Sequence, residues 1–168
     1  MTLSRKIHIS EPEDMIRLGE TIGRLLFPGA VIGLIGPLGA GKTTLVRGIA
    51  SGMGIEDGYI VSSPTFTLLQ NYPCQSGELW HLDLYRISGE EDLDSTGYRD
   101  SVDGARVLIV EWADRQPQVL PEEHLAVTIG YEPDGRTVTL DPKGGRYRSL
   151  VSGLVTGGGN YPPGGGGC

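Results

Sequence analysis

The stretch GPLGAGKTT, residues 36–44, decides what kind of fold this sequence adopts. It fits the pattern G-x-x-x-x-G-K-[ST] in full, a loop whose glycines let consecutive backbone N–H groups turn inward around a phosphate at the start of a helix. The pattern predicts that Lys42 reaches the β- and γ-phosphates of a nucleotide and that the Thr43 hydroxyl ligates Mg²⁺. The expected nucleotide-binding residues are Gly39, Ala40, Gly41, Lys42, Thr43 and Thr44, with Thr44 near the α-phosphate.

The flanking sequence supplies the context that a phosphate loop requires. Residues 30–35, AVIGLI, form a short apolar run that is typical of a strand buried on both faces. Leu45, Val46 and Ile49 follow at helical spacing. A strand before the motif and a helix after it favour a phosphate loop over the alternative, a glycine turn that carries a surface lysine.

Capping signals predict two further helices. Ser10 and Glu13 have the spacing of a capping box, and the apolar residues after them recur at helical spacing until residues 28–29, Pro-Gly, end the pattern. Ser88 and Glu91 have the same spacing and predict a short helix over EEDLDSTGYRD.

Five segments predict additional strands. Residues 65–72 and 79–85 flank the turn-forming stretch PCQSGE, and residues 124–131 and 136–140 flank EPDG, so each pair predicts an antiparallel hairpin. Residues 106–112, RVLIVEW, predict another buried strand. We therefore expect an α/β fold that includes antiparallel hairpin strands.

The chain length fits one domain, which we expect over residues 1–155. Seven of the last 12 residues are glycine, a composition that cannot pack a core. Residues 156–168 are therefore expected to form a flexible tail, with docking to a partner as the alternative role.

Charge and composition exclude several classes of protein. The net charge is -7, with no basic block, so we do not expect the chain to capture a nucleic acid by itself. Two scattered cysteines predict neither a disulfide framework nor a zinc site. No apolar run approaches the roughly 20 residues of a membrane span, and the first residues lack the apolar core of a secretory signal. A cytoplasmic location is expected.

Two acidic residues are candidates for the second metal anchor that a phosphate loop needs. Glu111 directly follows an apolar strand, where an uncompensated carboxylate is costly to bury, and we expect it to bind the metal directly or through water. Asp83 would then hold a metal-bound water or orient the attacking water. The alternative for Asp83 is a strand-surface acid paired with Arg86 or another cation.

Residues near these acids carry weaker signals. Thr65 lies in SPTF, where it is either a sensor of the γ-phosphate or a plain turn threonine. Trp112 is expected to face away from Glu111, either in the core or against a partner. His8, His81 and His124 are isolated, and we expect them to be packing residues rather than ligands.

Taken together, the motifs resemble those of the TsaE (YjeE) ATPases. GPLGAGKTTLVRGIA, SPTFTLLQNY, HLDLYR, TGYRD and VLIVEWADR occur in the order of that family, and the resemblance covers roughly residues 7–136. It implies a three-layer P-loop NTPase fold with a mixed central sheet. Residues 113–118 vary in that family and the glycine-rich tail has no counterpart, so no role passes to either segment.

The resemblance also implies a function. Thr43 and Glu111 would bind Mg²⁺, Asp83 and Thr65 would serve ATP hydrolysis or sense the γ-phosphate, and Arg136 would lie near the nucleotide. Glu11 and Pro12 match a segment that approaches the base. Family members hydrolyse ATP weakly and act on a TsaD–TsaB complex in the threonylcarbamoyladenosine modification of transfer RNA. The partners would hold that RNA.

Two other functions are compatible with the same loop. A small-molecule kinase would use Arg99 of TGYRD in a minimal lid, although no substrate-binding insert of adequate size is apparent. A binding module would hold the nucleotide as a switch without turnover, and the pair of acids argues for hydrolysis instead. The absence of an NKxD stretch favours ATP over GTP.

Overall fold

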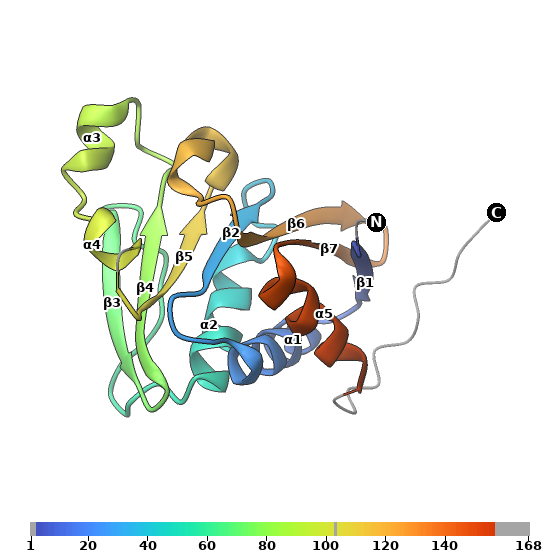
Figure 1. Ribbon diagram of the computed structural model, residues 1–168. Coiled ribbons are helices and arrows are strands. Elements are labelled where there is room, and N and C mark those ends of the chain that lie inside the picture. Colours follow the sequence, from blue (N-terminus) through green and yellow to red (C-terminus); the bar gives the residue numbers. More distant parts are fainter. Residues whose placement is uncertain (1–2, 103, 157–168) are drawn as a thin grey trace.

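The computed structural model describes residues 3–102 and 104–156 (Figure 1). The predicted tail was to begin at Thr156, which instead ends a helix, and its residues 157–168 lie outside the described residues. The strands are β1 (Arg5–Ile9), β2 (Val31–Ile35), β3 (Leu69–Cys74), β4 (Gly77–Asp83), β5 (Val107–Glu111), β6 (His124–Glu132) and β7 (Gly135–Lys143). The helices are α1 (Pro12–Leu25), α2 (Lys42–Gly52), α3 (Glu90–Asp94), α4 (Arg99–Val102) and α5 (Gly145–Thr156), with 3-10 helices η1 (Ala113–Arg115) and η2 (Pro117–Val119).

The strands form one mixed sheet in the order β1-β7-β6-β2-β5-β4-β3. Strands β4, β5, β2 and β6 run parallel in the centre, while β3, β7 and β1 are antiparallel to their neighbours. Both predicted hairpins are confirmed, as β3–β4 and β6–β7. The loop of residues 36–41 connects the central strand β2 to α2, so it lies at the carboxyl edge of the parallel strands, where open α/β sheets bind ligands.

Helices cover the two faces of the sheet unequally. Figure 1 shows α1, α2 and α5 together on one face. They close the larger apolar core, to which β5 contributes Ile109 and β4 contributes Leu79. The opposite faces of the same strands, with Leu82 and Leu108, meet the short elements α3 and η1 in a smaller core. This arrangement confirms the expected three layers and assigns alternate residues of β4 and β5 to opposite cores.

Helices α1 and α2 pack against each other through glycines. A Cβ atom built on Gly48 of α2 would lie 2.3 Å from the Ile16 carbonyl oxygen of α1, and one built on Gly52 would lie 2.1 Å from the Glu20 carbonyl oxygen. Only glycine allows backbones to approach this closely. The start of α1 is thereby brought beside the start of α2 and the glycine-rich loop.

The structure corrects several predicted boundaries. Helix α1 is capped by Glu11 and Asp14 rather than by Ser10 and Glu13, because Pro12 occupies the first helical turn. Residues 65–68 form a turn instead of extending β3. The segment after Ser88 divides into α3 and α4, and the N-cap of α3 is Gly89.

Helix α5 was missed in the sequence. Its glycines obscure an apolar face at helical spacing, formed by Tyr147, Leu150, Val151 and Leu154, all of which are buried. The Tyr147 hydroxyl accepts a hydrogen bond from the Val31 N–H (2.9 Å), which joins α5 to the start of the central strand.

Candidate functional site

Three segments meet at the carboxyl edge of the parallel strands. The glycine-rich loop follows β2, Glu111 ends β5, and Asp83 ends β4. Strands β4 and β5 are paired so that Asp83 lies directly opposite Glu111. Both carboxylates are almost fully buried, at 1% and 2% exposure. The register of the sheet thus places two acids beside the loop, as the sequence predicted.

The glycine-rich loop has the backbone shape of an anion-binding nest. Gly41 is the N-cap of α2 and has φ of 112°, a left-handed conformation that favours glycine. The first N–H groups of α2 have no partner within the helix and carry partial positive charge. Loop and helix together therefore present N–H donors where a phosphate would bind.

Lys42 is held inside the cleft by its own loop. Its Nζ donates hydrogen bonds to the carbonyl oxygens of Gly36 (2.8 Å) and Pro37 (2.9 Å) and lies 4.1 Å from the centre of the Trp112 ring. Burial lowers the pKa of Lys42, while the negative charges of Glu111 and Asp83 act in the opposite direction. Contacts within the chain thus hold the ammonium in the cleft.

Glu111 receives two hydrogen bonds on the same oxygen. The Thr43 hydroxyl donates to Glu111 Oε1 (2.8 Å), and His81 Nε2 lies 2.9 Å from that atom. Burial by itself would raise the pKa of Glu111, but these hydrogen bonds and the charge of Lys42 outweigh it and leave the pKa lowered. The carboxylate is therefore ionised at neutral pH.

Asp83 accepts hydrogen bonds from residues of the SPTF turn. Ser63 Oγ (2.8 Å) and Thr65 Oγ1 (3.1 Å) donate to Oδ2, and the Tyr85 N–H (2.8 Å) donates to Oδ1. The alternative prediction, in which Asp83 pairs with Arg86, is wrong, because the carboxylate accepts its hydrogen bonds from these three groups. The Arg86 guanidinium lies instead over the Phe66 ring, 4.3 Å from its centre.

These groups line a cavity of about 400 Å³ between the glycine-rich loop, the start of α2 and the ends of β4 and β5. It brings together the predicted Gly39, Gly41, Lys42, Thr43, Thr44, Thr65, Asp83 and Glu111 with four residues that were not predicted there, Leu38, Ser63, Tyr85 and Trp112. The hydroxyl and carboxylate oxygens are hard ligands of the kind that Mg²⁺ prefers.

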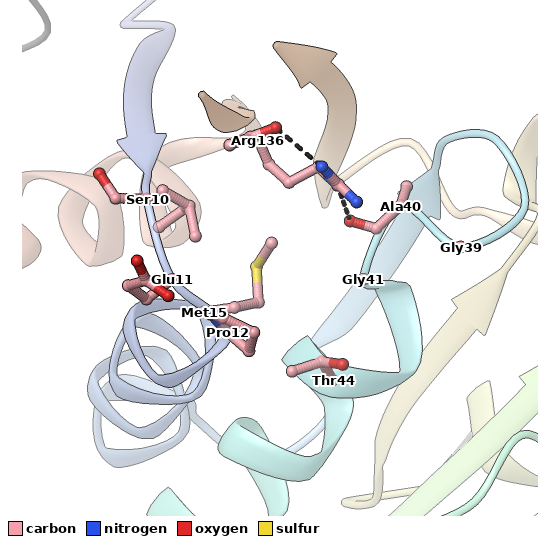
Figure 2. Close-up of a pocket in the computed structure, with 11 residues that line it drawn as sticks. Ser10, Glu11, Pro12, Met15, Gly39, Ala40, Gly41, Thr44 and Arg136 are labelled. Atoms are coloured by element: carbon pink, nitrogen blue, oxygen red, sulfur yellow. Dashed lines mark hydrogen bonds between the residues drawn. The ribbon is translucent and has the colours of Figure 1, made fainter. Parts of the chain in front are cut away.

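A second cavity of about 210 Å³ lies between the glycine-rich loop, the start of α1 and the start of β7 (Figure 2). It is lined by the predicted residues Glu11, Pro12, Gly39, Ala40, Gly41, Thr44 and Arg136, together with Ile9, Ser10, Met15 and Gly135. Figure 2 shows the Arg136 side chain reaching across this cavity to the loop, where Nε donates to the Ala40 carbonyl oxygen (3.2 Å). Gly39, Gly41 and Thr44 line both cavities, so one elongated ligand can occupy the two together.

Besides Leu38 and Tyr85, sequence reasoning missed or misplaced three side chains of the site. His81 was expected to be a packing residue, yet it contacts Glu111. Trp112 was expected to face away from Glu111, but its left-handed backbone (φ 59°) turns its ring into the cleft above Lys42. Ser63 was given no role and donates to Asp83. The alternation of His81 with Leu82 along β4 was the available signal for the first of these, because it gives His81 the same face as Asp83.

Within residues 3–102 and 104–156, no group of three or more His, Cys, Asp or Glu side chains is arranged to hold a metal. None of the helices in this part of the chain is long and apolar enough to cross a membrane.

Comparison with known proteins identifies the family of the chain. The family model described as "Threonylcarbamoyl adenosine biosynthesis protein TsaE" matches residues 9–138. The chain is 32% identical to the tRNA threonylcarbamoyladenosine biosynthesis protein TsaE of Haemophilus influenzae, over 86% of this chain and 94% of that protein. It is 40% identical to the protein of the same name from Treponema pallidum, over 76% and 93% of the two chains.

A solved structure extends the agreement to the fold. The crystal structure of Bacillus subtilis YdiB superimposes with a TM-score of 0.76 at 33% identity, and the match covers 94% of this chain and 97% of that one. The P-loop NTPase fold expected from the sequence is consistent with this likeness. The family match and the similarity of sequence and fold lead to one conclusion: the chain belongs to the TsaE family.

Proposed function

We propose that this protein is a Mg²⁺-dependent ATPase, slow by itself, that serves the threonylcarbamoyladenosine modification of transfer RNA by acting on a TsaD–TsaB complex. The observation that carries the ATPase proposal is the convergence of Lys42, Thr43 and Glu111 within one cavity at the glycine-rich loop. Membership of the TsaE family supports the pathway.

The two cavities suggest how ATP would lie. Its phosphates would occupy the larger cavity, where loop N–H groups and Lys42 meet them. Its base and ribose would occupy the smaller cavity between Glu11, Pro12 and Arg136. Thr44 lines both cavities and would stand near the α-phosphate.

Thr43 and Glu111 are the residues that would hold Mg²⁺. Their oxygens already lie 2.8 Å apart, so a metal-bound water or the ion itself would find both groups in place. When bound, the ion would neutralise charge that develops on the transferred phosphoryl group. Asp83 would accept a hydrogen bond from the attacking water, and Thr65 would report the γ-phosphate by exchanging its bond to Asp83 for one to the phosphate.

Replacing Asp83 with Asn should lower the rate of ATP hydrolysis by about 100-fold, the usual loss when a group that orients or activates water is removed. Nucleotide affinity should not fall and should rise slightly, because the substitution removes a negative charge that would repel the phosphates. Single-turnover hydrolysis and calorimetric titration with ADP would separate the two effects. Asp94→Asn on the exposed surface is the matched control; equal rates in both variants would contradict the role of Asp83.

Replacing Arg136 with Ala should weaken ADP binding about fivefold, because a single hydrogen bond at the edge of the nucleotide pocket is lost and the loop carbonyl of Ala40 loses its donor. Calorimetric titration with ADP measures this directly. Arg148→Ala on α5 removes a cation of the same kind outside both cavities and should leave the affinity unchanged. Equal affinity of the Arg136 and Arg148 variants would contradict the placement of the nucleotide in the smaller cavity.

The partner proposal follows from charge as well as family. A net charge of -7 makes direct binding to transfer RNA unfavourable, so the partner complex would hold the RNA. We also propose a cytoplasmic location, since the chain has only two cysteines and would not depend on an oxidising compartment.

The test of the whole proposal is ATP hydrolysis by the purified protein, alone and with the matching TsaD and TsaB proteins. A slow rate that rises when the pair is added supports it. A pair that neither binds nor alters the rate would remove the partner role. The kinase alternative gains no support from the lid-like segment, because Arg99 pairs on the surface with Asp94 (3.0 Å).

A further inference from the structure

We propose that His81 is a positioning residue, which holds the Glu111 carboxylate in the orientation that Mg²⁺ binding requires. This inference rests on the proposed function and adds to it a residue that is not itself a metal ligand. It starts from the contact between His81 Nε2 and Glu111 Oε1 at 2.9 Å.

The contact is fully enclosed. His81 is 0% exposed and Glu111 is 2% exposed, so water competes little for either group. Strands β4 and β5 are hydrogen-bonded neighbours, and His81 lies opposite Ile109. Ile109 is two residues before Glu111 and therefore shares its face of the sheet. His81 thus approaches the carboxylate from the core, whereas Thr43 approaches it from the start of α2.

The hydrogen on the imidazole can be assigned from burial. The Nδ1 atom of His81 is buried and has no hydrogen-bond partner among the described residues. An unpaired buried N–H would be costly, so the hydrogen belongs on Nε2, where it is donated to Glu111. His81 then orients the carboxylate through a donated hydrogen bond.

The two donors to Glu111, His81 and Thr43, would respond differently to a bound metal. The Thr43 oxygen would itself be a metal ligand, so its position would follow the ion. His81 is held in β4 and would not be a ligand. Both donors use Oε1 of Glu111, which lines the cavity, so Oε2 would be available to the metal or to its water. Loss of the His81 donor should therefore reduce metal-dependent binding in particular.

Two amide variants test this role. In His81→Gln the amide nitrogen falls near the position of Nε2 and keeps the donor, whereas in His81→Asn it falls near Nδ1 and cannot reach Glu111. The measurement is calorimetric titration with ADP, in Mg²⁺ and in EDTA. We expect Asn to lose about tenfold in affinity in Mg²⁺ only, and Gln to retain most of the wild-type affinity under both conditions.

The outcomes separate this inference from the proposed function. The role of His81 would be overturned, and the proposed function left standing, by either of two results. One is an Asn variant whose ADP affinity depends on Mg²⁺ as strongly as that of the wild-type protein; the other is an equal loss of ADP affinity in the Asn and Gln variants. ADP binding by the wild-type protein that is the same in Mg²⁺ and EDTA would overturn the metal site, and the role of His81 with it.

A second measurement needs neither variant to bind nucleotide. Nitrogen-15 shifts of the histidine rings in the ligand-free protein report which nitrogen carries the hydrogen. His81 should be the Nε2–H tautomer, and His124, whose Nδ1 lies 2.7 Å from the Pro121 carbonyl oxygen, should be the opposite Nδ1–H tautomer. An Nδ1–H tautomer at His81 would overturn the inference, whatever the variants do.

Discussion

Replacing Lys42 with Ala should weaken the binding of ATP and ADP by at least 10- to 100-fold. A hydrogen bond to a charged group contributes about 1.5–3 kcal/mol, and the burial of Lys42 places the loss at the upper end of that range. The loop carbonyl oxygens of Gly36 and Pro37 already hold the ammonium in the cleft, so little side-chain entropy remains to be lost when phosphate binds. Calorimetric titration with each nucleotide gives the affinity.

The loss should depend on the phosphates. Binding of adenosine, which has none, should be equally weak in the variant and the wild-type protein. Lys143→Ala is the matched control, because Lys143 pairs with Asp141 (2.8 Å) at the end of β7 and lines neither cavity. If ATP bound to Lys42→Ala as tightly as to the wild-type protein, the assignment of residues 36–44 as a phosphate loop would be wrong.

Replacing Gly48 with Ala should lower the melting temperature by roughly 3–10 °C. The added methyl group would lie 2.3 Å from the Ile16 carbonyl oxygen and 2.9 Å from Gly19 Cα, and neither backbone atom can rotate away. Overpacking of this kind costs about 1–3 kcal/mol, and about 2–4 °C accompanies each kcal/mol in a chain of this size. Thermal unfolding followed by circular dichroism measures the shift.

A second helical glycine provides the control. In Gly153→Ala on α5 the new methyl group would lie 3.5 Å from a Leu25 methyl carbon, an ordinary van der Waals contact, so the better helix propensity of alanine should leave stability unchanged or raised. Separation of α1 from α2 should also widen the smaller cavity and weaken ADP binding in the Gly48 variant. Equal melting temperatures for the two variants would contradict the close packing of α1 on α2.

Local patterns account for most of the fold that could be predicted. The motif at residues 36–44 and the hydrophobic runs beside it depend only on neighbouring residues, and the structure has the expected strand and helix there. Both hairpins were predicted because their turn residues lie between their strands. Helix α5 was missed because four of its 12 residues oppose the prediction of a helix: Gly145 and Gly153 disfavour a helix, and Ser149 and Ser152 favour turns.

The sequence by itself determined the chemistry of the site: a glycine-rich loop with Lys42 and Thr43, and two acids that end apolar strands. Only the tertiary structure decided which side chains act together. Thr43 meets Glu111 across 68 positions of sequence and His81 meets Glu111 across 30, and both contacts depend on the order and register of β2, β5 and β4. A periodic pattern shows which face of a strand is buried, but the neighbour on that face is chosen by packing between distant segments.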